Sequence, residues 1–220
     1  MGGFEYPAPG VIIPLLFLLG VLPVLVVMLT AYTKIVVVFL LLRSVLGLQQ
    51  VPPTMVTNGL ALVLTAFVMY PVGLQVMAGM EAAQQQKGPR QTLTVPEVVD
   101  AAREPLRAFL DKHANARERA FFVDAARRMV GATGAQAVGP KDFVVLVPAF
   151  LVSEITEAFV IGVLLALPFV VVDLVVANVL MALGMQMMPP TTVALPLKLL
   201  LLVVLDGWSR LAHALVLNYR

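Results

Sequence analysis

The feature that most restricts the fold of this chain is the length of its segments without charge. Residues 6–33 and 44–80 contain no Asp, Glu, Lys or Arg, over 28 and 37 residues respectively. Residues 158–172 and 174–197 are uncharged as well. About 20 consecutive apolar residues cross a bilayer as a helix. We therefore expect four membrane-type helices, at 11–33, 55–78, 158–183 and 191–217.

The middle of the chain has a different character, because 18 of the 28 charged residues fall between Glu81 and Asp142. Residues 95–113 and 116–130 place apolar side chains at helical spacing among charged ones, which predicts two water-exposed helices. We expect Pro105 to open a helix at its first position. This section is interpreted as a small helical insert. The expected organisation is a first apolar hairpin (1–80), the insert (81–142) and a second apolar hairpin (143–220).

The two apolar parts share a repeated motif. The pattern Leu-Gly-x-Gln-x-x-Pro-Pro-Thr occurs at 46–54 and again at 183–191, an offset of 137 residues. Proline lacks the backbone N–H and disfavours helix in the residue before it, so each hairpin is expected to bend at its Pro-Pro pair. These pairs are Pro52, Pro53, Pro189 and Pro190. Convergence on one kind of turn remains the alternative to duplication.

The sidedness of the chain follows from charge and from the number of spans. Two spans separate the bends, so both are expected on the same side. Arg43 flanks the first bend and Lys198 follows the second, and short loops facing the cytoplasm favour basic residues. This places the bends inside, and the insert and both ends of the chain outside.

Six charged residues sit within or beside the apolar segments, where charge is costly unless it is paired or faces water. They are Lys34, Glu154, Glu157, Asp173, Lys198 and Asp206. Glu154 and Glu157 share one helix face at i, i+3 spacing, so they need a cation, a shared proton or solvent. Lys34 and Lys198 are the candidate partners. We favour pairing between subunits; pairing within one subunit and an ion relay are the alternatives.

Methionines gather at the second bend, where Met185, Met187 and Met188 surround Gln186 just before the prolines. Met is adaptable and fills irregular gaps in cores, which is the simpler interpretation for any one of them. Backbone at a helix break rarely faces lipid, because its unpaired groups need protein or water. The group is therefore also a candidate lining of a path, and apolar constrictions can gate by excluding water.

Composition excludes several classes of function. The chain has 60% apolar and 13% charged residues, against about a quarter charged in soluble domains. A net charge of +2 gives no basis for a nucleic-acid partner. The absence of cysteine and the presence of only two histidines leave little for a metal site. No nucleophile motif is present, so we expect neither an enzyme nor a cofactor.

Residues 30–38 and 42–53 resemble the R subunit of the type III secretion export apparatus, whose flagellar counterpart is called FliP. Further matches lie at 148–154, 168–177, 184–190, 195–198 and 206–208, so the resemblance runs from about residue 20 onwards. Residues 117–122 look more like the injectisome branch. The first ten residues have no Lys or Arg, so we expect no cleavable signal peptide, and this also favours the injectisome branch.

The resemblance implies an all-helical subunit that forms a homopentamer and joins S and T subunits in a helical ring complex. It implies U and V subunits and unfolded secreted proteins as further partners. It implies an inner-membrane location, with the assembled core held at the periplasmic side. The family's methionine gasket maps onto Met185, Gln186 and Met187, with Met188 beside it. Gln186 departs from that pattern, and Thr156 stands where a lysine is expected. A stand-alone membrane transporter and a purely structural scaffold are the alternatives.

Overall fold

The computed structural model describes residues 20–21, 23–48, 52–87, 93–131, 138–185 and 187–220, and within them the protein is built from helices. The main elements are α2 (Tyr32–Leu46), α3 (Thr54–Lys87), α4 (Val95–His113), α5 (Ala116–Val130), α6 (Phe143–Ala182), α7 (Pro190–Val204) and α8 (Gly207–Leu217). A short helix, Pro23–Leu29, precedes α2 and is bent from it by 85°. The expected all-helical fold is confirmed for the described residues.

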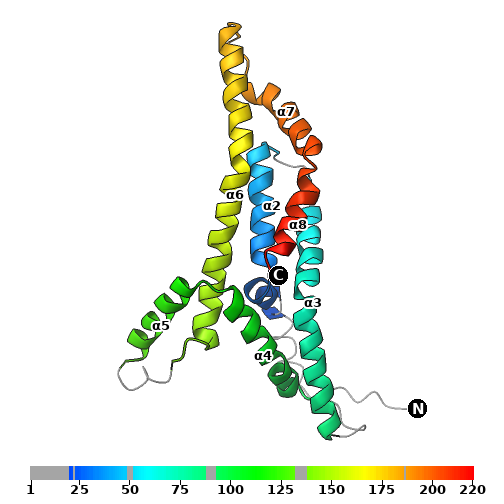
Figure 1. Ribbon diagram of the computed structural model, residues 1–220, viewed down its shortest axis with the longest axis vertical. Coiled ribbons are helices and arrows are strands. Elements are labelled where there is room, and N and C mark those ends of the chain that lie inside the picture. The colour runs from blue at the N-terminus through cyan, green and yellow to red at the C-terminus, as the bar shows by residue number, and fades with distance from the viewer. Residues whose placement is uncertain (1–19, 22, 49–51, 88–92, 132–137, 186) are drawn as a thin grey trace, which may run out of the picture.

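Helix α6 is the spine of the molecule and runs along most of its long axis (Figure 1). Helix α2 lies beside its middle and makes its most extensive contacts with it. Helix α7 descends from the far end of α6, and α8 continues beside α2 and α3 (Figure 1). The insert helices α4 and α5 diverge at the other end, α4 against α3 and α5 against the start of α6.

Helix α2 supplies the centre of the core. Ile35, Val38, Phe39 and Leu42 on α2 are fully or almost fully buried, and Phe150 of α6 belongs to the same apolar cluster. Most large apolar residues of α3 and of the second half of α6 are instead exposed. A soluble monomer seldom exposes so much contiguous apolar surface, so these faces are suited to lipid or to other subunits.

The two repeated motifs form the same backbone turn. At the end of α2 the N–H of Leu48 donates to the carbonyl of Arg43 at 3.2 Å, and Gly47 has φ 77°. At the end of α6 the N–H of Met185 donates to the carbonyl of Leu180 at 2.9 Å, and Gly184 has φ 71°. This is the glycine-capped ending in which a left-handed residue closes the helix. Both turns lie toward the same end of the long axis (Figure 1).

The four expected apolar helices differ from the structure in their bounds. The helix expected at 55–78 is α3, which continues to Lys87. The helix expected at 158–183 begins fifteen residues earlier, at Phe143, and continues through Pro148 and Pro168 as one helix of 40 residues. The segment expected as one helix at 191–217 is instead α7 and α8, bent by 59°. The segment expected at 11–33 is bent before α2, and residues 11–19 lie outside the described part. The length of an apolar segment indicates a long helix, but it carries no information about where that helix bends or ends.

The expectation that Pro105 opens a helix was wrong. Pro105 lies inside α4, and the helix begins at Val95 with Pro96 in its first turn. Thr94 and Glu97 form the capping box there, with the N–H of Thr94 donating to Glu97 Oε2 at 2.8 Å. Such a reciprocal cap satisfies the free N–H groups of the first turn. The start of α4 is therefore determined by Thr94 and Glu97 rather than by the later proline.

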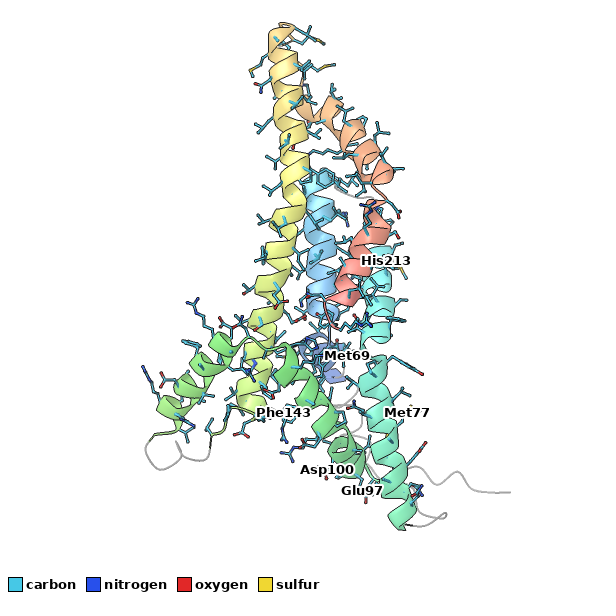
Figure 2. The ribbon with its side chains drawn as sticks, viewed as in Figure 1. Met69, Met77, Glu97, Asp100, Phe143 and His213 are labelled. Atoms are coloured by element: carbon cyan, nitrogen blue, oxygen red, sulfur yellow. The ribbon has the colours of Figure 1, made fainter. Side chains whose placement is uncertain are left out.

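Two helices, Thr54–Gln85 and Phe143–Ala182, are long and apolar enough to cross a membrane, and two bent pairs raise the number to four. The four segments expected from the sequence overlap these units only in part, because the first was expected at 11–33 and helix α2 was not among the expected helices. Figure 2, in which side-chain atoms are coloured by chemical element, shows the contrast with the middle section. Nitrogen and oxygen atoms gather on α4 and α5, and Glu97 and Asp100 are labelled on α4.

Candidate functional site

The methionine turn is the first part of the candidate site. It joins α6 to α7 at the far tip of the molecule (Figure 1), and Pro190 occupies the first turn of α7. Met187 is 99% exposed, while Met185 and Met188 are exposed by about 40%. The N–H of Met188 donates to the carbonyl of Met185 at 3.2 Å, which keeps the turn tight. Gln186 lies outside the described residues.

Side-chain hydrogen bonds brace the first turn, at the end of α2. The side chain of Arg43 donates from Nε to the carbonyl of Leu48 at 3.1 Å and from a terminal nitrogen to Thr54 Oγ1, also at 3.1 Å. Pro52 and Pro53 follow the turn, and the carbonyl of Pro53 accepts from the N–H of Val56 at 2.9 Å. The sequence analysis used Arg43 only to assign sidedness and gave no signal of this bracing role.

A buried charge cluster joins α2 to α6. Lys34 Nζ lies 3.0 Å from Glu154 Oε1 and 2.7 Å from Glu157 Oε2. Lys34 is 1% exposed and Glu154 is fully buried, whereas the side chain of Glu157 is 47% exposed. Of the two candidate cations, Lys34 lies beside both carboxylates, and the contact is made within one chain, whereas pairing between subunits was the favoured expectation. Thr156 is exposed and donates its hydroxyl to the carbonyl of Val152, so it takes no part in the cluster.

A second ion pair joins α7 to α6, and its lysine also reaches the end of α2. Lys198 Nζ on α7 lies 2.6 Å from Asp173 Oδ2 on α6 and donates to the carbonyl of Val45 at 3.0 Å. That carbonyl belongs to the last turn of α2, where a helix leaves carbonyl groups without intrahelical partners. Lys198 therefore binds α7 both to α6 and to the end of α2 near the first turn.

Asp206 does not join either cluster. It is exposed at the break between α7 and α8, with a left-handed backbone at φ 51°. Within the described part of the chain it has no inter-helix ion pair, so that expectation is not met there. Its carbonyl accepts the N–H of Arg210 in the first turn of α8 at 3.1 Å. Asp206 therefore shapes the corner of the broken helix.

Two residues that contact the charge cluster or the helix beside it, Tyr219 and Asn115, were not found by the sequence analysis. Tyr219 donates its hydroxyl to Glu154 Oε2, and its ring lies under Lys34 Nζ at 4.3 Å from the centroid. The backbone N–H of Asn115 donates to Ser153 Oγ at 2.8 Å, and the Ser153 hydroxyl donates to the carbonyl of Ala149. No spacing in the sequence connects these residues, because the partners lie 65 and 38 positions apart.

Burial also acts on two groups outside the apolar spans. The pKa of His113 is lowered to about 4, first by burial and then by the positive charges of Lys112 and Lys34. The pKa of the Tyr219 phenol is raised, chiefly by burial and then by the negative charge of Glu154. At neutral pH His113 is therefore uncharged, and the Tyr219 hydroxyl keeps the proton that it donates.

The candidate site consists of charges paired between helices and of exposed methionines at a turn. The described residues contain no group of three His, Cys, Asp or Glu side chains able to hold a metal ion. The buried charges are paired between helices, and the most exposed apolar group sits on a projecting turn. Such a site can bind helices together and can close or line a path.

The fold and the site define a helical protein with long apolar helices, two similar glycine-capped turns and a charged middle section. The FliP family model matches residues 15–215, and the chain belongs to the FliP family. The resemblance to the R subunit of the type III secretion export apparatus is confirmed. The chain is thus a component of a secretion apparatus, in a family not known for catalysis.

Relatives with functions in secretion match nearly the whole chain. The hypersensitivity response secretion protein HrcR of Ralstonia nicotianae is 50% identical over 202 residues, 92% of this chain and 93% of the relative. The Yop proteins translocation protein R of Yersinia pestis is 44% identical over 208 residues, 94% and 95% of the two chains. The virulence protein YscR of Salmonella typhimurium is 39% identical over 212 residues, 96% and 97% of the two.

Proposed function

We propose that this protein is a core subunit of the type III export gate, in which its methionine turn seals a central pore for unfolded proteins. Copies of the chain form a homopentamer and join S and T subunits of the apparatus, with U and V subunits as further neighbours. The complex belongs to the bacterial inner membrane, and its assembled core is held at the periplasmic side.

The observation that carries this proposal is the position and exposure of the methionine turn. Met187 is almost fully exposed at the tip of α6, beside the exposed Leu183. An apolar tip in water is unfavourable, at about 25 cal/mol per Å² of apolar surface. A ring of equivalent tips around one axis would bury this surface. The flexible thioethers could then close on each other and still yield to a passing chain.

The exposed apolar faces supply the second support. The described parts of α3 and of the second half of α6 expose large apolar residues along their length. Obligate interfaces between subunits are more apolar than ordinary surfaces. These faces therefore suit self-association and contact with neighbouring subunits, and the paired charges hold the helices in the arrangement that presents them.

The test replaces the three described methionines of the turn with alanine. We expect Met185→Ala/Met187→Ala/Met188→Ala to leave the oligomer intact by native mass spectrometry and to raise ion conductance of the complex in planar bilayers, because the constriction loses its apolar bulk. The matched control is Met129→Ala, because Met129 is 88% exposed on α5, away from the apolar faces of α3 and α6. It should leave conductance at the wild-type level.

The outcomes separate the proposal from its two rivals. Unchanged conductance in the turn variant, with an intact oligomer, would remove the gasket. Normal secretion after the turn is changed to leucine and alanine would favour a purely structural scaffold. Movement of a solute by the purified monomer in liposomes would favour a stand-alone transporter, with Glu154, Glu157 and Asp173 as its candidate site.

A further inference from the structure

Tyr219 reaches the charge cluster from the turn that follows α8. Its side chain is buried, its hydroxyl donates to Glu154 Oε2, and its ring face lies 4.3 Å from Lys34 Nζ. A cation over an aromatic face is attracted to it, so the ring helps to place the ammonium group. Phe109 and His113 of α4 pack against the same ring at centroid distances of 6.2 and 5.1 Å, which fixes its orientation.

The hydrogen bonds of Glu154 show why the hydroxyl matters. Glu154 Oε1 is buried, and among the described residues it pairs with Lys34 Nζ at 3.0 Å. Glu154 Oε2 accepts from Tyr219. A buried carboxylate without donors is costly. Tyr219 therefore supplies the donor for Oε2, which Glu154 would otherwise have to satisfy by drawing Lys34 further toward itself.

Because Tyr219 satisfies Glu154 Oε2, Lys34 can pair with a second carboxylate, that of Glu157. Its Nζ lies closer to Glu157, at 2.7 Å, than to Glu154. Glu157 is the outer end of the cluster, since its side chain is half-exposed on α6, near the exposed apolar residues Phe159 and Val160. An unpaired carboxylate there would place a bare charge at the border of an apolar face, where burial of charge is unfavourable.

We propose that Tyr219 is a positioning residue that holds Lys34 toward Glu157 and so keeps the α6 face neutral for packing against a second copy of this chain. The part of this inference that concerns self-association rests on the proposed function. The part that concerns Lys34 is a property of the single subunit. Loss of the hydroxyl lets Lys34 turn to Glu154, and Glu157 is then left without its cation.

The first test measures Glu157 in the detergent-purified monomer. Tyr219→Phe removes the hydroxyl and keeps the ring, and Tyr70→Phe is the matched control, because Tyr70 is exposed on α3. Glu157 is labelled with a water-soluble carbodiimide and glycine ethyl ester, and the product is quantified by mass spectrometry. We expect labelling to rise several-fold in Tyr219→Phe and to stay at the wild-type level in Tyr70→Phe.

Two further readouts exclude a general loosening of the fold. Labelling of Asp173, which pairs with Lys198 instead, should be unchanged in Tyr219→Phe. Adding Glu154→Gln should bring Glu157 labelling back toward the wild-type level, because the competing carboxylate is gone. Unchanged labelling of Glu157, an equal rise at Asp173, or no recovery in the double variant would each overturn the positioning role.

The second test concerns assembly. We expect self-association of Tyr219→Phe, measured by analytical ultracentrifugation in detergent, to weaken by about tenfold, the effect of one unpaired polar group in an apolar contact. Adding Glu157→Gln should restore association to within about twofold of Glu157→Gln alone. Additive losses would overturn the neutral-face role. A wild-type chain that does not associate would refute the proposed homopentamer, while the labelling result would still decide the placement of Lys34.

Discussion

Removal of the Lys34 ammonium tests whether the buried charge cluster stabilises the subunit. In Lys34→Met the fully buried Glu154 and the half-exposed Glu157 both lose a cation at 3.0 and 2.7 Å. Taking one partner from a buried ion pair costs about 3–5 kcal/mol, because the other charge stays buried without compensation. The exposed part of Glu157 is screened by solvent and adds little. We therefore expect a loss of about 3–5 kcal/mol, almost all of it through Glu154.

The loss is large enough to be seen as a change in melting temperature. In chains of 150–250 residues, 1 kcal/mol corresponds to about 2–4 °C, so Lys34→Met should melt about 6–20 °C below the wild type. The assay is thermal unfolding of the detergent-purified monomer, followed by circular dichroism. Lys141→Met is the matched control, because Lys141 is mostly exposed and lies 3.3 Å from Asp111. It should change the melting temperature by less than about 2 °C.

A second variant shows whether the loss arises from the uncompensated carboxylate. Lys34→Met/Glu154→Gln removes the stranded charge and keeps an amide oxygen to accept from Tyr219, so at least half of the lost stability should return. A melting temperature of Lys34→Met within about 3 °C of the wild type would refute the stabilising role of the pair. A double variant no more stable than the single one would show that the effect comes from the lysine side chain's packing instead.

Two other predictions concern the first turn and the insert. Gly47→Ala should lower the melting temperature by a few degrees, because a left-handed backbone costs a residue with Cβ about 1–2 kcal/mol, whereas the exposed helical Gly59→Ala should raise it slightly. The pKa of His113 is lowered to about 4 in the folded protein, and the unfolded chain takes up this proton near pH 6.5. The contribution of neutral His113 to the free energy of unfolding is therefore fully present above about pH 6.5, and it is lost as the pH decreases toward 4. In His113→Phe, melting measured at pH 7.5 and 5 should show a smaller decrease.

The insert helices could be predicted closely from the sequence, because their end signals are local. Residues 95–113 and 116–130 match α4 and α5. Thr94 caps the first helix with Glu97, and Asn115 caps the second by accepting the N–H of Arg117 at 2.9 Å. Signals of this kind lie within four residues of the helix end, so they remain readable without tertiary structure.

The long helices were less predictable, since their limits depend on packing. Proline in an isolated helix is a strong breaker, yet α6 continues through Pro148 and Pro168. Contacts with α2, α4, α5 and α7 along its length stabilise it. Only part of the candidate site could be predicted, because contacts between distant parts of the chain leave no local signal in the sequence. Apolar surroundings marked Lys34 and Lys198 as candidate partners of Glu154 and Glu157 but could not choose between them, and Tyr219 carries no local signal of its contact with α6.

The two copies of the repeated turn share a backbone and differ in how they are held. At the first turn the side chain of Arg43 donates to the carbonyl of Leu48 and to Thr54. The residue 137 positions later is Leu180, which cannot donate, and within the described residues no side chain hydrogen-bonds to the second turn. Lys198 adds a further bond next to the first turn, at Val45. Among the described residues, side-chain bracing is thus found at the first turn, whereas the methionines that we propose to yield to a passing chain lie at the second.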